Sequence, residues 1–222
     1  MSEQEAACAA DDASLDVFSQ AFFDARREEL AQRVKPKRFK HSLGVSETAE
    51  RMAHIYGADE QMARLAGLLH DWDKGYDDDG IRTRVAQLGL SEQLASYLDM
   101  PHLLHGPTAA AALARRFPQL PSELIQAIRL HTTGAVEMTD LDMIVYTADA
   151  IEPSRDYPGI DELRKQVGVV PLRELYLATF QHVLENLVQR RKRIHPDTVT
   201  VWNSYVARDK ACRADKNMKG NK

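Results

Sequence analysis

Apolar residues recur along most of this chain three and four positions apart, and no stretch alternates between apolar and polar residues like a half-buried strand. One N-terminal stripe contains Val17, Phe18, Ala21, Phe22 and Ala25. The spacing predicts helices over residues 15–33, 36–56, 59–70, 81–88, 92–98, 108–117, 123–131, 141–151, 161–167, 172–193 and 197–207. We therefore expect an all-α fold, a single helical bundle.

The two ends of the chain are polar and lack this periodicity. We interpret residues 1–14 and 208–222 as flexible extensions and residues 15–207 as the folded domain. With 222 residues, of which 44% are hydrophobic, the chain can bury a sizeable core but is short for two domains.

Composition narrows the class of protein. A formal net charge of −4 argues against binding nucleic acid by bulk electrostatics. No run of about 18 apolar residues could span a membrane, and the acidic start does not look like a signal sequence, so we expect a cytoplasmic protein. Cys8 and Cys212 are too few for a disulfide framework or a thiolate zinc site.

Carboxylates and imidazoles fall in apolar surroundings, which is the informative feature of the sequence. The segment MARLAGLL is apolar on nearly every side and predicts a buried helix, and His70 and Asp71 follow directly at its end. Asp149 is surrounded by apolar residues in MIVYTADAI. His41 shares a helical stripe with later apolar residues, which points its ring inward.

Two further histidines repeat this pattern. His131 ends the segment ELIQAIRLH, and His105 lies just before Pro107 and an alanine-rich helix. Each position alone has a structural explanation, such as a core histidine or a buried acid paired with arginine. If the positions converge in space, imidazole and carboxylate ligands without thiolate suit Fe, Mn, Co, Ni or Zn.

The order His41, His70-Asp71, Asp149 resembles the signature of the HD metal-dependent phosphohydrolase superfamily. Within it, the chain is similar to the YqeK-type branch, which hydrolyses diadenosine tetraphosphate symmetrically to two ADP. The resemblance covers about residues 37–159 and continues more faintly to IHPDT. The motifs that carry it are RFKHSLGVSETAERMAHIYGAD, ARLAGLLHDWDK, LLHGPTAA, AIRLHTTG and YTADAIEPSRDYPG.

The resemblance implies a role for each matching residue. The implied metal ligands are His41, His70, Asp71 and Asp149, with iron as the first choice of metal. His105 and His131 are implied to approach the substrate phosphates and to help hold a second ion. The implied nucleotide contacts and the lysine of the HD-x-x-K stretch are Arg38, Thr132, Arg155 and Lys74.

We expect hydroxide supplied by the metal to attack a phosphorus of the central bridge of the substrate. Asp71 is expected to bind the metal and to orient the water, and His105 or His131 to protonate the leaving phosphate. A polyphosphate also needs cations along its pocket, and Arg38, Lys74 and Arg155 are the candidates. The branch usually has a small or apolar residue where this chain has Asp73, so an added carboxylate beside the metal is expected to raise cation affinity or to repel phosphate.

Several alternatives stay open from the sequence. Another HD-type nucleotidase or phosphodiesterase, and a non-catalytic sensor of dinucleoside polyphosphates, fit the same residues. A homodimer is a further option. Four other histidines carry weaker signals: His54 is expected on the surface and His182 in packing, while His102 and His195 have little support as ligand or nucleotide contact.

Overall fold

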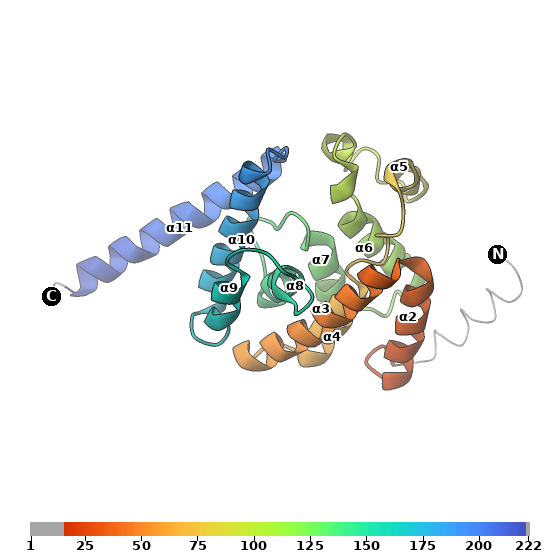
Figure 1. The fold of residues 1–222 in the computed structure, drawn as a ribbon, viewed down its shortest axis with the longest axis horizontal. Helices are drawn as coiled ribbons and strands as arrows, with labels where there is room; N and C mark the ends of the chain where they lie inside the picture. The colour runs from red at the N-terminus through yellow and green to blue at the C-terminus, as the bar shows by residue number, and fades with distance from the viewer. Residues whose placement is uncertain (1–15, 221–222) are drawn as a thin grey trace, which may run out of the picture.

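The computed structural model describes residues 16–220, with side chains up to Asp209. Within these residues the chain forms α-helices, two short 3₁₀ turns and no strand, so the predicted all-α fold is confirmed (Figure 1). Residues 1–14, interpreted above as an extension, lie outside the described part. In chain order the elements are α2 (Gln20–Arg33), α3 (Pro36–Tyr56), α4 (Glu60–Leu69), α5 (Asp78–Gln87), η1 (Ala95–Tyr97), η2 (Pro101–Leu103), α6 (His105–Arg116), α7 (Ser122–Leu130), α8 (Asp140–Ile151), α9 (Ile160–Gln166), α10 (Leu172–Gln189) and α11 (Pro196–Gly220).

Helices α4 and α8 form the centre of the core. Helix α8 packs against α3, α4, α7 and α10, and most of its residues are buried. Helix α4 is buried along most of its length, as its apolar sequence predicted. Because both central helices carry candidate ligands at or near their C-terminal ends, core packing places these ligands relative to one another.

Gly67 allows α3 and α4 to approach closely. A Cβ atom at this position would lie only 2.8 Å from the Cα atom of Ser46 on α3. The hydroxyl of Ser46 donates a hydrogen bond of 2.7 Å to the carbonyl oxygen of Arg64 on α4. This contact fixes the helix that carries His41 against the helix that ends at His70.

Helix α2 begins at Gln20 rather than at residue 15, and two further predicted helices differ from the observed elements. Residues 92–98 form only the 3₁₀ turn η1, since a segment this short, followed by Pro101, cannot extend into a stable helix. Helix α10 ends at Gln189 rather than at residue 193. Arg191 adopts a left-handed backbone conformation with φ of 51°, and the N–H of Lys192 bonds back to the carbonyl of Leu187, which ends the helix.

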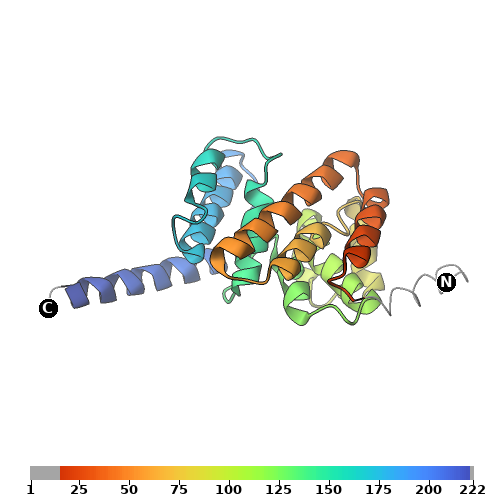
Figure 2. The ribbon, with the colours of Figure 1, turned by 90° about the horizontal axis from the view of Figure 1, so that it is seen from below.

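Helix α11 extends beyond residue 207, where the predicted helix ended, into the part of the chain interpreted from the sequence as a flexible extension. Helix α11 continues to Gly220 because no proline or glycine interrupts it after Pro196 and because alanine, lysine and arginine favour helix. The helix leaves the body of the molecule and projects outward (Figures 1 and 2). Continuous local propensity therefore decides its length, rather than packing against the core.

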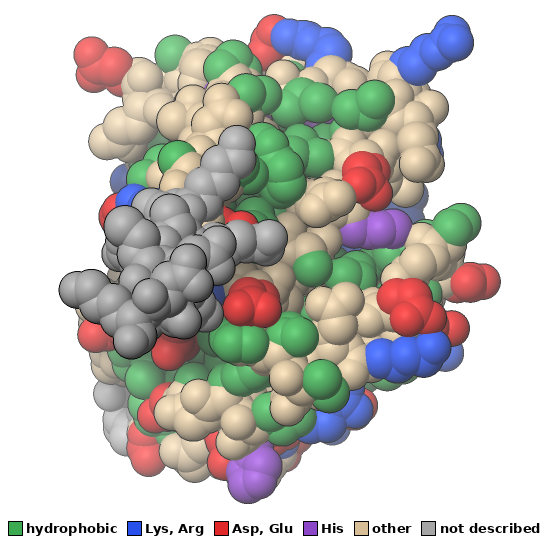
Figure 3. Space-filling model, turned by 90° about the vertical axis from the view of Figure 1, so that its left-hand side faces the viewer, with side chains coloured by type: hydrophobic (Ala, Val, Ile, Leu, Met, Phe, Trp, Pro, Cys, Tyr) green, Lys and Arg blue, Asp and Glu red, His purple; other side chains and the backbone are tan. Residues whose placement is uncertain are grey.

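No helix among the described residues combines the length and apolar character needed to cross a membrane. Figure 3 faces the end of the molecule from which α11 projects and shows hydrophobic side chains interspersed with polar and charged ones.

Candidate functional site

The predicted metal ligands come together at the ends and inner faces of the core helices. His41 lies within α3, His70 and Asp71 follow α4, and Asp149 lies near the end of α8. Nε2 of His41 lies 2.9 Å from Oδ1 of Asp149, and Nε2 of His70 lies 3.2 Å from Oδ2 of Asp71. Residues far apart in the sequence thus form one cluster of imidazoles and carboxylates.

Asp71 lies between two pairs of histidines. Its Oδ2 is 3.2 Å from Nε2 of His70 and 3.7 Å from Nε2 of His41. Its Oδ1 is 3.2 Å from Nε2 of His105 and 4.0 Å from Nε2 of His131. The side chain is almost fully buried. One carboxylate could therefore serve both imidazole pairs at once.

Three of the four rings are oriented by the backbone. Nδ1 of His70, His131 and His105 lies 2.7, 2.6 and 2.9 Å from the carbonyl oxygen three residues earlier. His70 and His131 directly follow the last residues of α4 and α7, where helix carbonyls lack a partner four residues later. Because a carbonyl only accepts, Nδ1 carries the hydrogen in each ring, and Nε2 faces the cluster as a lone pair.

His41 is oriented by Glu152, which the sequence analysis missed. Nδ1 of His41 lies 2.9 Å from Oε1 of Glu152, whose carboxylate is buried just after α8. The sequence feature that could have revealed Glu152 is an acid directly after the apolar residues of α8, within the segment ADAIEP.

The cluster fits a metal ion. Three overlapping sets of three residues could each hold an ion, because within each set the donor atoms lie within 4.8 Å of one another. Together the sets contain His41, His70, Asp71, His105, His131 and Asp149. Nε2 of His41 and of His70 is buried without a hydrogen-bond partner among the described residues. Nε2 of His105 and Nε2 of His131 lie 3.0 Å apart, a distance that two lone pairs tolerate only with a proton or a cation between them.

Burial and charge set the protonation of the cluster. Burial alone raises the pKa values of Asp71 and Asp149, but neighbouring histidines, and Arg155 beside Asp149, hold both pKa values well below the usual range. Burial lowers the pKa values of His105 and His131. Both acids are therefore ionised at neutral pH, as the carboxylate ligands of a cation must be.

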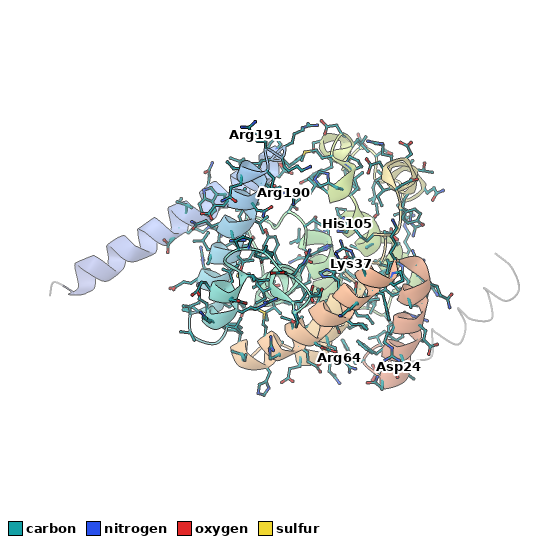
Figure 4. All side chains as sticks on the ribbon, in the orientation of Figure 1. Asp24, Lys37, Arg64, His105, Arg190 and Arg191 are labelled. Atoms are coloured by element: carbon teal, nitrogen blue, oxygen red, sulfur yellow. The ribbon has the colours of Figure 1, made fainter. Side chains whose placement is uncertain are left out.

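A cavity of about 970 Å³ opens onto the cluster. In the view of Figure 4, His105 lies between Lys37 on α3 and Arg190 next to α10, and all three residues line this cavity. Cations from four parts of the chain line it: Lys35, Lys37, Arg38, Lys74, Arg155 and Arg190.

The predicted nucleotide-contacting residues all line the same cavity. Nη1 of Arg38 lies 2.8 Å from Oδ2 of Asp71, and Nη2 of Arg155 lies 2.5 Å from Oδ1 of Asp149. Nζ of Lys74 is 3.3 Å from Nδ1 of His105. The hydroxyl of Thr132 is buried without a hydrogen-bond partner among the described residues. These cationic and polar groups thus lie directly beside the carboxylates of the cluster.

The expectation that Asp73 adds a carboxylate beside the metal is wrong. Oδ1 of Asp73 accepts from Arg33 at 3.1 Å, and Oδ2 accepts from Arg84 at 3.2 Å. The side chain is fully buried and belongs to none of the three donor sets. Its two arginine partners come from α2 and α5, so Asp73 joins helices instead of binding a cation.

Replacing Asp73 by asparagine is expected to destabilise the fold without weakening metal binding. Two charge-assisted hydrogen bonds weaken, and because both arginines are partly exposed, the loss is about 1–3 kcal/mol. Urea denaturation measures the change in unfolding free energy. Unchanged stability, or a clear loss of metal affinity, would contradict this assignment.

Of the four other histidines, two lie away from the cavity and two line it. His54 is exposed, as predicted, and pairs with Glu60. His195 is buried, and its ring stacks on Tyr97. His102 and His182 line the cavity, so packing does not fully account for His182.

Fold and site together define a class: helical proteins with a buried histidine–carboxylate centre at the base of a cation-lined cavity. A family model described as HD domain matches residues 38–154, which include all four predicted metal ligands. The symmetrical bis(5'-nucleosyl)-tetraphosphatase of Halalkalibacterium halodurans is 34% identical to this chain, over 83% of the chain and 99% of the relative. That of Staphylococcus aureus is 35% identical, over 83% and 94%.

A solved structure from Clostridium acetobutylicum, described as a predicted HD superfamily hydrolase involved in NAD metabolism, superposes with a TM-score of 0.76. It is 32% identical and is matched over 84% of this chain and 97% of its own. The chain belongs to the HD-domain family and, within it, to the family of the symmetrical bis(5'-nucleosyl)-tetraphosphatases.

Proposed function

We propose that this protein is a metal-dependent hydrolase that cleaves diadenosine tetraphosphate symmetrically into two ADP. The observation that carries the proposal is a single cavity that contains both the histidine–carboxylate cluster and cations from four parts of the chain. Relatives that match most of this chain are named for this reaction.

The cavity suits a long anionic substrate. Its volume of about 970 Å³ lies at the upper end of the range for small-molecule sites. Symmetrical cleavage requires the central phosphates at the cluster, so each nucleoside extends away from it. On one side, Tyr157, Val183 and Leu187 offer aromatic and apolar surface to a base, while Arg190 offers charge to a phosphate.

We propose that His41, His70, Asp71 and Asp149 hold the metal. When bound, it lowers the pKa of a water molecule and polarises the phosphoryl group under attack. Iron is the proposed metal, on the family resemblance, and Mn, Co, Ni and Zn also suit these donors.

The remaining residues position the substrate and move protons. Arg38, Lys74 and Arg155 balance the charge of the phosphates, and the unpaired hydroxyl of Thr132 is placed to donate to a phosphate oxygen. In His105 and His131, Nδ1–H is committed to a backbone carbonyl. Either ring must therefore first take a proton at Nε2 before it can pass one to the leaving phosphate. A cytoplasmic location and a homodimer stay predictions from the sequence.

Incubation of metal-loaded protein with diadenosine tetraphosphate, followed by chromatography, tests the proposed reaction. Two ADP per substrate are expected, because both halves of the substrate leave as diphosphates. AMP with ATP would contradict symmetrical cleavage. Free phosphate from nucleoside monophosphates would indicate a nucleotidase, and stoichiometric binding without turnover would indicate a sensor.

A further inference from the structure

His41 differs from the other three histidines of the cluster in how its ring is held. The others use a backbone carbonyl three residues earlier, close to a helix end. His41 lies inside α3, where each carbonyl is already bonded to the N–H four residues later. Its Nδ1–H therefore needs an acceptor from another part of the chain.

Glu152 is the acceptor, and its carboxylate is itself held in place. Oε1 lies 2.9 Å from Nδ1 of His41, and the side chain is 1% exposed. The backbone N–H of Ser154 donates to Oε2 at 2.7 Å, and the Ser154 hydroxyl donates to Oε1 at 2.5 Å. Arg164 donates to the Glu152 carbonyl at 2.7 Å. The carboxylate is thus fixed at both oxygens before it meets the imidazole.

Gly44, one turn after His41 on the same helix, leaves room for this carboxylate. A Cβ atom at Gly44 would lie only 2.4 Å from Oε2 of Glu152. Glycine is otherwise unfavourable in the interior of a helix. The absence of a side chain here is therefore matched to the position of Glu152.

We infer that Glu152 is a positioning residue, which fixes the orientation and tautomer of the His41 imidazole so that Nε2 faces the metal centre. The inference rests on the metal centre proposed above. A carboxylate that accepts from the second nitrogen of a ligating histidine also makes that ligand more basic, and losing such a partner typically weakens metal binding about 10- to 100-fold.

Titration of Co²⁺ into metal-free protein, followed by its visible absorption, tests the role of Glu152. We expect Glu152→Gln to weaken Co²⁺ binding roughly 10- to 100-fold and to change the absorption bands, with an unaltered helical circular-dichroism signal. Glu60→Gln is the matched control, because Glu60 pairs with Nδ1 of the exposed His54 at 2.8 Å, and it should bind Co²⁺ like the unmodified protein. Unchanged affinity in Glu152→Gln would overturn the inference.

Gly44→Ala provides a second route to the same result. Its methyl group displaces the carboxylate, so it should weaken Co²⁺ binding while Glu152 is present. Added to Glu152→Ala, it should cause no further loss, because no carboxylate remains to be displaced. An equal loss in both backgrounds would show that Gly44 acts independently of Glu152 and would count against the inference. Failure of the unmodified protein to bind Co²⁺ would refute the metal centre itself.

Discussion

Replacing Asp71 by asparagine is expected to abolish the hydrolysis of diadenosine tetraphosphate. The carboxylate lies between both histidine pairs and also contacts Arg38. Its loss removes a shared anionic ligand, so turnover should fall by more than the roughly 10- to 100-fold typical of losing an outer partner of a ligand. Steady-state kinetics with saturating metal measures the effect.

Asp73→Asn is the matched control for this experiment. It removes the same charge two residues further along from an equally buried aspartate, yet this aspartate pairs with Arg33 and Arg84. Asp71→Asn should lose activity with its helical signal intact, whereas Asp73→Asn should lose stability and keep activity in the folded protein. Near-normal turnover in Asp71→Asn would show that the cluster is not the reaction centre.

Removing the metal is expected to lower the midpoint of thermal unfolding and to stop hydrolysis. Without a cation, two proposed ligand atoms, Nε2 of His41 and Oδ1 of Asp149, face each other at 2.9 Å in a buried cluster that also contains the ionised Asp71. A metal at one hundred times its dissociation constant stabilises the folded state by about 2.7 kcal/mol. For a chain of this size, the loss corresponds to roughly 5–10 °C.

Differential scanning calorimetry with and without a chelator measures this shift. Addition of Fe²⁺, Mn²⁺ or Co²⁺ to the stripped protein should restore both the midpoint of unfolding and the formation of ADP. The rate of ADP formation regained with each ion ranks the metals. Asp71→Asn should respond less to the chelator than the unmodified protein. Full activity in the stripped protein, with residual metal excluded by elemental analysis, would contradict a metal-dependent reaction.

Local features of the sequence predicted most of the helices correctly. Helix α3 begins and ends where Pro36 and Gly57 indicated, because these residues act on the backbone beside them. Burial of α4 followed from its apolar residues alone. The predicted helix ends were wrong at two places. Helix α10 ends early because Arg191 adopts a left-handed backbone conformation, and α11 continues because its residues favour helix even where apolar periodicity stops.

The candidate ligands could be selected from the sequence, because an acid or imidazole in an apolar segment is costly and therefore conspicuous. Their convergence could not be derived from the residues alone, since spacing within one helix does not determine how that helix packs against others. Asp71 and Asp73 show this limit clearly. Both are buried acids on the same short segment, but one meets imidazoles and the other meets arginines from α2 and α5.

By itself, the sequence determined the helical class of this protein, the burial of helix α4 and the kinds of donor atoms at the centre of the molecule. These properties depend on periodicity, composition and the solvation of individual groups. Only the tertiary structure decided which neighbour each polar group meets: Asp71 between two histidine pairs, and Glu152 against a histidine 111 positions away. The physical reason is that hydrogen bonds and ion pairs act over a few ångströms, and only helix packing brings such distant residues that close.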